Sequence, residues 1–78
     1  MSDENEMSFG QKAVGLSFNP SGDPIVNMLK ASFSDILDDM DALRQQAASP
    51  EVKRMLSIAI TEAQTAQMWA VKAATWRD

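Results

Sequence analysis

The chain of 78 residues lacks cysteine, histidine and tyrosine altogether. Without cysteine it has neither disulfides nor thiolate metal sites, and without histidine it lacks the commonest metal ligand and acid–base catalyst. Carboxylates, hydroxyls and lysines are the candidates left for catalysis. A domain of this size has a marginal core, and oligomerisation is the support that remains once disulfides and metals are excluded. We therefore expect a non-enzymatic chain, without a cofactor, that forms an oligomer.

Strong charge of one sign and long apolar runs are missing too. The net charge is −4, and from Phe9 onward seven basic residues stand against eight acidic ones. Such a balance provides no basic surface for the phosphates of duplex nucleic acid. No apolar run approaches the ~20 residues of a membrane span, and no signal-peptide pattern opens the chain. We expect a cytoplasmic protein that binds neither duplex DNA or RNA nor a membrane.

Glycine and proline are scarce, with three of each, and they mark the boundaries of the expected helices. The chain from Glu51 onward contains neither and is rich in alanine, methionine, leucine and isoleucine, which favours one uninterrupted helix. Ser49 and Pro50 are typical of a helix start, because the hydroxyl caps and the proline needs no N–H partner. We predict a helix over residues 50–77, roughly 40 Å long.

A first long helix is predicted over residues 24–47, with Asp23 as its N-cap and Pro24 as its first residue. Its apolar side chains recur at steps of three and four residues, as a helical face requires; they are Ile25, Leu29, Phe33, Ile36, Met40 and Leu43. The connection at 48–50 is too short for anything but a tight turn, so the two helices should form an antiparallel hairpin. The hairpin would bring Lys53 and Arg54 near the acidic run at 38–41.

The N-terminal part divides in two. Residues 1–8 are acidic and poor in apolar side chains, which indicates a flexible tail. Residues 9–22 are apolar enough to pack on another surface, such as a neighbouring subunit, but Gly10 and Gly15 argue against a full helix. We expect an arm or a short helical turn there.

The C-terminal helix is apolar over most of its circumference, so several of its sides must be covered. The rest of the chain is too short to cover them, and we expect Trp69 and Trp76 to be buried between copies. The predicted fold class is all-α: a single domain over residues 9–78, built as an antiparallel helical hairpin with an N-terminal arm and assembling into a homo-oligomer.

Residues 21–24 place backbone N–H groups at a helix start, where anions bind, but Asp23 favours plain capping instead. Lys30 lies off the apolar face, and from spacing alone it is either solvated or functional. Phe18 is likewise either an anchor or a base-stacking platform. The acidic run is typical of a solvated face, because neighbouring helical positions point apart and do not converge on a metal.

Two blocks of the sequence resemble a known family. The first, over residues 10–30, reads GQKAVGLSFNPSGDPIVNMLK, and the second, over residues 53–76, reads KRMLSIAITEAQTAQMWAVKAATW. Together they resemble the phage anti-CBASS cyclic-oligonucleotide sponges and the related Thoeris anti-defence sponges, which share a helical hairpin domain. The resemblance implies a small non-enzymatic protein, usually hexameric, that sequesters the cyclic-nucleotide messengers of bacterial immune systems.

The resemblance also implies site residues. In that family cyclic dinucleotides bind between protomers, where an aromatic residue stacks on a base and a helix lysine meets the phosphate. Lys30 matches the lysine; Leu16 stands where the family often has tyrosine, and Phe18 is the nearest aromatic. An arginine early in the second long helix binds cyclic trinucleotides at a threefold junction, and Arg54 matches it. The predicted ligand-binding residues are Lys12, Phe18, Asn19, Pro20, Ser21, Lys30 and Arg54.

We interpret the chain as a sponge that binds cyclic di- or trinucleotides without cleaving them, in the cytoplasm of an infected bacterium. Two other functions stay open. A small helical oligomer that binds a protein, such as a phage regulator, would use the arm for partner contact and would show no nucleotide affinity. A phosphodiesterase that degrades the same messengers would need a metal site, and the acidic run offers no converging ligands for one.

Overall fold

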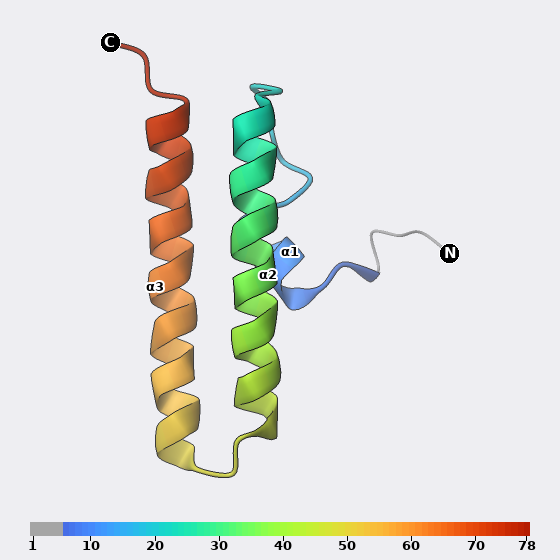
Figure 1. The fold of residues 1–78 in the computed structure, drawn as a ribbon, viewed down its shortest axis with the longest axis vertical. Helices are drawn as coiled ribbons and strands as arrows, with labels where there is room; N and C mark the ends of the chain where they lie inside the picture. Colours follow the sequence, from blue (N-terminus) through green and yellow to red (C-terminus); the bar gives the residue numbers. More distant parts are fainter. Residues whose placement is uncertain (1–5) are drawn as a thin grey trace.

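The computed structural model describes residues 6–78, which fold into three helices and no strand. A short helix, α1 (Phe9–Val14), precedes two long ones, α2 (Pro24–Gln46) and α3 (Pro50–Ala74). The long helices run antiparallel as a hairpin, and α1 packs against α2 and barely touches α3 (Figure 1). The prediction of an all-helical hairpin is confirmed. The predicted flexible tail, residues 1–8, falls mostly outside the described residues.

Both long helices begin where the sequence predicts. The side chains of Asp23 and Ser49 each accept a backbone N–H from the first turn of their helix, at 2.9 and 3.3 Å, and a proline follows each cap. The helices end at Gln46 and Ala74, earlier than the expected ends at residues 47 and 77. The last turn of a helix lacks intrahelical partners for its carbonyls, so sequence patterns place this boundary less sharply than a cap.

The short helix α1 agrees with the expectation of a short helical turn in the arm, although Gly10 does not interrupt it. Ser8 caps it through a reciprocal pair of hydrogen bonds with the third helical residue, and Gly15 ends it in the left-handed conformation, with φ 64°. Gly10 lies inside the helix, where a Cβ would sit 2.1 Å from the backbone oxygen of Ser34 on α2. The Gly10 N–H also donates to Asp38 Oδ1 at 2.7 Å. Glycine thus allows α1 to touch the backbone of α2.

The core between the three helices is small, with buried apolar side chains at Val14, Val26, Leu37 and Ile60. The buried side of α2 is rotated away from the apolar face that the sequence pattern indicates. On that face Ile25, Ile36 and Leu43 are about half exposed, and Phe33 and Met40 only border the core. The difference arises because α1 as well as α3 covers α2, and the side that α2 turns to them includes polar residues.

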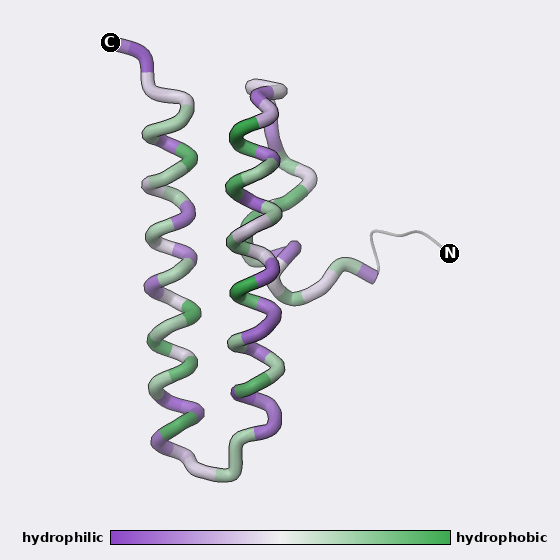
Figure 2. Tube along the Cα trace, in the orientation of Figure 1, coloured by the Kyte–Doolittle hydropathy of each residue, from purple (hydrophilic) through white to green (hydrophobic). Residues whose placement is uncertain are grey.

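Both long helices leave much apolar surface uncovered within one chain. Hydrophobic residues, drawn in green, recur along their whole length (Figure 2). The exposed large side chains on α3 are Met55, Ile58, Met68 and Trp69, and Trp76 is exposed just beyond its end. Exposed apolar surface on this scale is typical of a protein that contacts a partner. None of the described helices combines the length and the hydropathy needed to cross a bilayer.

Candidate functional site

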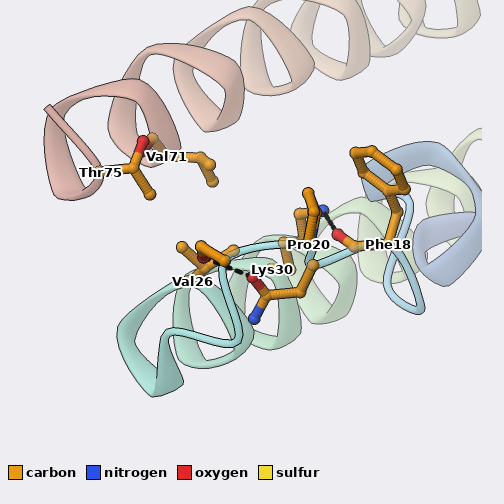
Figure 3. Close-up of a pocket in the computed structure, with 8 residues that line it drawn as sticks. Phe18, Pro20, Val26, Lys30, Val71 and Thr75 are labelled. Atoms are coloured by element: carbon orange, nitrogen blue, oxygen red, sulfur yellow. Dashed lines mark hydrogen bonds between the residues drawn. The ribbon is translucent and has the colours of Figure 1, made fainter.

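A pocket of about 160 Å³ lies at the end of the hairpin where α2 begins and α3 ends. Residues 18–21, which we call the arm turn, and the first turns of α2 form one side of it, and the last turns of α3 form the other (Figure 3). This arm pocket is lined by Phe18, Asn19, Pro20, Ser21, Val26, Lys30, Val71 and Thr75. Five of the seven predicted ligand-binding residues are thus brought together, and Lys30 is the one charged side chain among the lining residues.

Lys30 is buried, with 6% of its surface exposed, so the alternative of a solvated lysine is wrong. Its Nζ donates to the backbone oxygen of Gly15 at 3.0 Å and to that of Phe18. These carbonyls compensate for removing the ammonium from water, which would otherwise cost several kcal/mol. An ammonium has three N–H donors, so one is left for a ligand.

Phe18 presents its ring beside this ammonium. The Lys30 Nζ lies 5.4 Å from the centroid of the ring, within the range of a cation–π interaction. The side chain of Phe18 is not an anchor in the core of the chain, because Phe18 is 69% exposed. The hydrogen bond from Lys30 Nζ to the backbone oxygen of Phe18 therefore holds a cation next to an open aromatic face.

Asn19 and Ser21 use their polar groups mainly to hold the arm turn itself. The Asn19 amide nitrogen donates to the Asp23 carbonyl at 3.0 Å and to Asn27 Oδ1 at 2.9 Å. The Ser21 hydroxyl donates to Asn19 Oδ1 at 2.8 Å and accepts the Asp23 N–H at 3.2 Å. The amide of Asn19 has no donor left for a ligand. Asp23 caps the helix start, which supports the capping interpretation of residues 21–24 over an anion site.

Lys12 and Arg54 lie outside the arm pocket. Lys12 is exposed on α1. Arg54 is at the start of α3, at the opposite end of the hairpin, where two of its nitrogens meet the Glu51 carboxylate at 2.5 and 3.1 Å. The hydrogen bonds between them lower the pKa of Glu51 and raise the pKa of Arg54 from their ordinary values.

The sequence suggested that the acidic run on α2 would lie near the cations at the start of α3. In the structure the acidic run does not pair with them. Asp38 accepts the N–H of Gly10, and Asp41 pairs with Arg44 at 2.8 Å, so both find partners on α1 or on their own helix. Of the three, only Asp39 is exposed to solvent as expected of the whole run, whereas Asp38 and Asp41 are partly buried. Within residues 6–78 no three acidic side chains are grouped so as to hold a metal ion.

Sequence reasoning missed four residues at the arm pocket, one of which is Val26 in the first turn of α2. Val71 and Thr75 on α3 face Val26 and Lys30 across it (Figure 3), and Asn27 supports it from outside through Asn19. The signal for Val71 and Thr75 was available, because in an antiparallel hairpin the end of the second helix meets the start of the first. The contact made by Asn27 had no signal in the pattern, since it depends on how residues 19–23 fold back.

A comparison with known protein families shows which family the chain belongs to. Residues 11–75 match the family model described as "Acb2/Tad1, hairpin domain". The chain belongs to the Acb2/Tad1 family. This is the family of anti-CBASS and anti-Thoeris sponges, and the resemblance inferred from the two sequence blocks is confirmed. Searches of curated proteins and of solved structures returned no match.

The matched region of the Acb2/Tad1 hairpin domain begins in α1 and ends at Thr75. It therefore includes the arm from residue 11 onward, both long helices, and every residue that lines the arm pocket. Lys12 and Arg54 lie within it as well. The candidate site is thus part of the domain that defines the family and not an addition to it.

Proposed function

We propose that the chain is an anti-defence sponge that binds cyclic di- and trinucleotide immune messengers and holds them without cleaving them, in the cytoplasm of an infected bacterium. Membership in the Acb2/Tad1 family supports an anti-defence role. The observation that carries the ligand class is the pairing, in one pocket, of an exposed phenylalanine ring with a lysine ammonium. Nucleotides offer the two complementary groups, a base that stacks and a phosphate that accepts charged hydrogen bonds.

In this proposal the arm pocket takes the cyclic dinucleotide. The Phe18 ring stacks on a base, and the remaining N–H of Lys30 meets a phosphate. The apolar lining from Val26, Val71 and Pro20 excludes water around the contact, which strengthens a charged hydrogen bond. Asn19 and Ser21 shape the wall of the pocket, because their donors are used within the arm turn.

A second site is proposed for cyclic trinucleotides, around Arg54. Its guanidinium is exposed, with 61% of the side chain accessible, and an arginine fork suits phosphate oxygens. Three copies of Arg54 around a threefold junction would face three phosphates, which requires a homo-oligomer, and a hexamer in our proposal. The uncovered apolar sides of α2 and α3 support such an assembly.

The test is a retention-and-release experiment with the purified chain. It is mixed with a panel of cyclic di- and trinucleotides, filtered, washed and heat-denatured, and the released ligand is identified by chromatography. Ligand that is retained and released intact supports the sponge. Ligand converted to a linear product would assign a phosphodiesterase instead.

A folded chain that retains no nucleotide would favour the second candidate, a helical oligomer that binds a protein. One observation supports that alternative. Trp69 and Trp76 are 65% and 64% exposed, and together with Lys72 and Ala73 they line a second hollow at the C-terminal end of α3. Exposed tryptophans are frequent energetic centres of protein interfaces.

A further inference from the structure

We propose that Asn27, which does not line the arm pocket, is a positioning residue for ligand binding because it holds the arm turn in place through Asn19. The role rests on the proposed function and adds to it a residue that neither the sequence pattern nor the pocket lining points to. Asn27 lies in the second turn of α2, and its Oδ1 accepts a hydrogen bond from Asn19 Nδ2 at 2.9 Å.

Two side chains of α2 reach up to the arm turn. Lys30 bonds to the carbonyl of Phe18 at the beginning of the turn, and Asn27 bonds to the next residue along, Asn19. Asn27 and Lys30 are three positions apart, so they lie on one face of the helix in adjacent turns. Together they fasten the arm turn at two consecutive residues.

Apart from these two contacts, the arm turn makes no hydrogen bond to the body of α2 in the part of the chain that the structure describes. In the described chain the hydrogen bonds of residues 19–21 end on Asn27 or on residues 19–23 themselves, through the Asn19 side chain, the Ser21 hydroxyl and the Gly22 N–H. Asn19 is the centre of this network, because its amide group donates twice and accepts once. The orientation of the Asn19 amide directly affects the position of the Ser21 hydroxyl, which donates a hydrogen bond to it.

Without Asn27 the turn keeps the bond between Lys30 and Phe18 and the bonds of Asn19 and Ser21 to Asp23, the N-cap of α2, but it loses the bond from Asn19 to a side chain further along the helix. The wall made by Pro20 and Ser21 is then less constrained relative to Lys30 and to Val71 on the opposite side. Ligand affinity should fall because the pocket must be ordered during binding, although every lining residue is still present. Asn27 itself is exposed, so its replacement leaves no buried polar group unpaired.

The experiment measures binding of cyclic di-AMP by calorimetry to the wild type and to Asn27→Leu, Asn19→Ala and the double variant. Leucine favours helices more than asparagine does, so folding should be kept. We expect Asn27→Leu to weaken binding about fivefold, the effect of one ordinary hydrogen bond. The double variant should bind no more weakly than Asn19→Ala alone, because Asn27 acts through Asn19.

The matched control is Ser32→Leu, which adds the same side chain at an exposed position of α2 outside the pocket lining and should bind as the wild type does. A second readout is the NMR signal of the Asn19 side-chain amide. In Asn27→Leu it should shift and its protons should exchange faster with solvent, even without ligand. A purely structural effect of the substitution on α2 would not move this signal.

The outcomes separate the two proposals. If the wild type binds and Asn27→Leu binds equally well, the role of Asn27 falls and the sponge stands. Additive losses in the double variant would also overturn the role, because they place Asn27 and Asn19 in independent contacts. If the wild type binds neither cyclic di-AMP nor any other nucleotide of the panel, the proposed function falls and the role of Asn27 falls with it.

Discussion

The two cations proposed to meet phosphates are held in opposite ways, at opposite ends of the hairpin. Lys30 is buried, and two backbone carbonyls from the arm, a segment distant in sequence, fix its ammonium. Arg54 is exposed, and its hydrogen-bond partner is a carboxylate one turn away on the same helix. One position depends on the tertiary fold and the other on local helix geometry.

The difference indicates how each site is prepared for its ligand. Lys30 and Phe18 are already placed next to each other within one chain, so little ordering remains for binding. An exposed ion pair such as that of Arg54 and Glu51 contributes little to stability and exchanges readily. In our proposal, therefore, the Arg54 site depends on what surrounds it in an assembly and not on the chain alone. The following variants test this contrast, from the largest expected effect to the smallest.

The largest effect should come from Gly10→Ala, which attacks the contact that holds the arm. Its Cβ would overlap the backbone oxygen of Ser34, so α1 must shift away from α2. We expect the free energy of unfolding to fall by about 2–4 kcal/mol and dinucleotide binding to be lost. Urea denaturation followed by circular dichroism measures the free energy of unfolding. The control is Gly22→Ala, which is strained by its φ of 67° but meets no atom; equal losses in both would argue against the steric explanation.

Next in size is Lys30→Ala. It removes the ammonium that fixes two arm carbonyls and that we propose meets the phosphate, and truncating one partner of a buried charged contact should weaken cyclic dinucleotide binding by about 30-fold or more. The elution of the variant in size-exclusion chromatography should match that of the wild type, since Lys30 faces the arm. Amide hydrogen exchange should show loss of protection at the Leu16 and Phe18 N–H groups. Unchanged affinity would remove Lys30 from the site.

A smaller and selective effect is expected from Arg54→Ala. Loss of one exposed guanidinium per chain should weaken cyclic trinucleotide binding about tenfold, while dinucleotide binding stays the same. Calorimetry with one ligand of each class measures both. Lys53→Ala, which removes the neighbouring exposed cation, is the matched control and should change neither affinity. A parallel loss of both ligands in Arg54→Ala would point to damaged assembly.

The smallest effect concerns the partner of Arg54. The hydrogen bond to Arg54 holds the pKa of Glu51 below its ordinary value, so the pairing is fully present above the unfolded-state pKa of Glu51 and is lost only as the pH falls through its folded-state pKa. Trinucleotide binding should therefore be flat, as far as this pair is concerned, from about pH 6 to 8. Glu51→Gln should strengthen binding about twofold by releasing the guanidinium. If trinucleotide binding changes with pH between these limits, and Glu51→Gln abolishes the change, the prediction is wrong.

The sequence predicted the parts of the fold that depend on local chemistry. Caps at Asp23 and Ser49, each followed by a proline, determine where the long helices begin. The absence of glycine and of further proline keeps both uninterrupted, and the short connection between them makes a hairpin. The pattern was less informative about which side of α2 is buried, because a regular apolar face does not reveal that a second helix, α1, covers another side. The role of Gly10 was not predicted for the same reason: it allows a close approach to Ser34, which no local pattern contains.

The same distinction between local chemistry and tertiary contacts applies to the candidate site. Phe18 and Lys30 were indicated by resemblance and the structure places them together, but the burial of Lys30 by carbonyls of the arm depends on how the arm folds back. The hydrogen bond between Asn19 and Asn27 also closes over a loop, and residue types alone do not specify it. Val71 and Thr75 follow from the antiparallel topology once both helix lengths are known.

The placement of the tryptophans has a practical consequence. Trp69 and Trp76 are the only two in the chain; Trp69 is exposed on α3 and Trp76 is exposed just beyond its end. The fluorescence of Trp69 should therefore report on the surroundings of α3, whereas Trp76 shares a hollow with Ser21 and Thr75 of the arm pocket and should respond when that pocket fills. Dilution of an assembly should red-shift the emission as the indoles return to water.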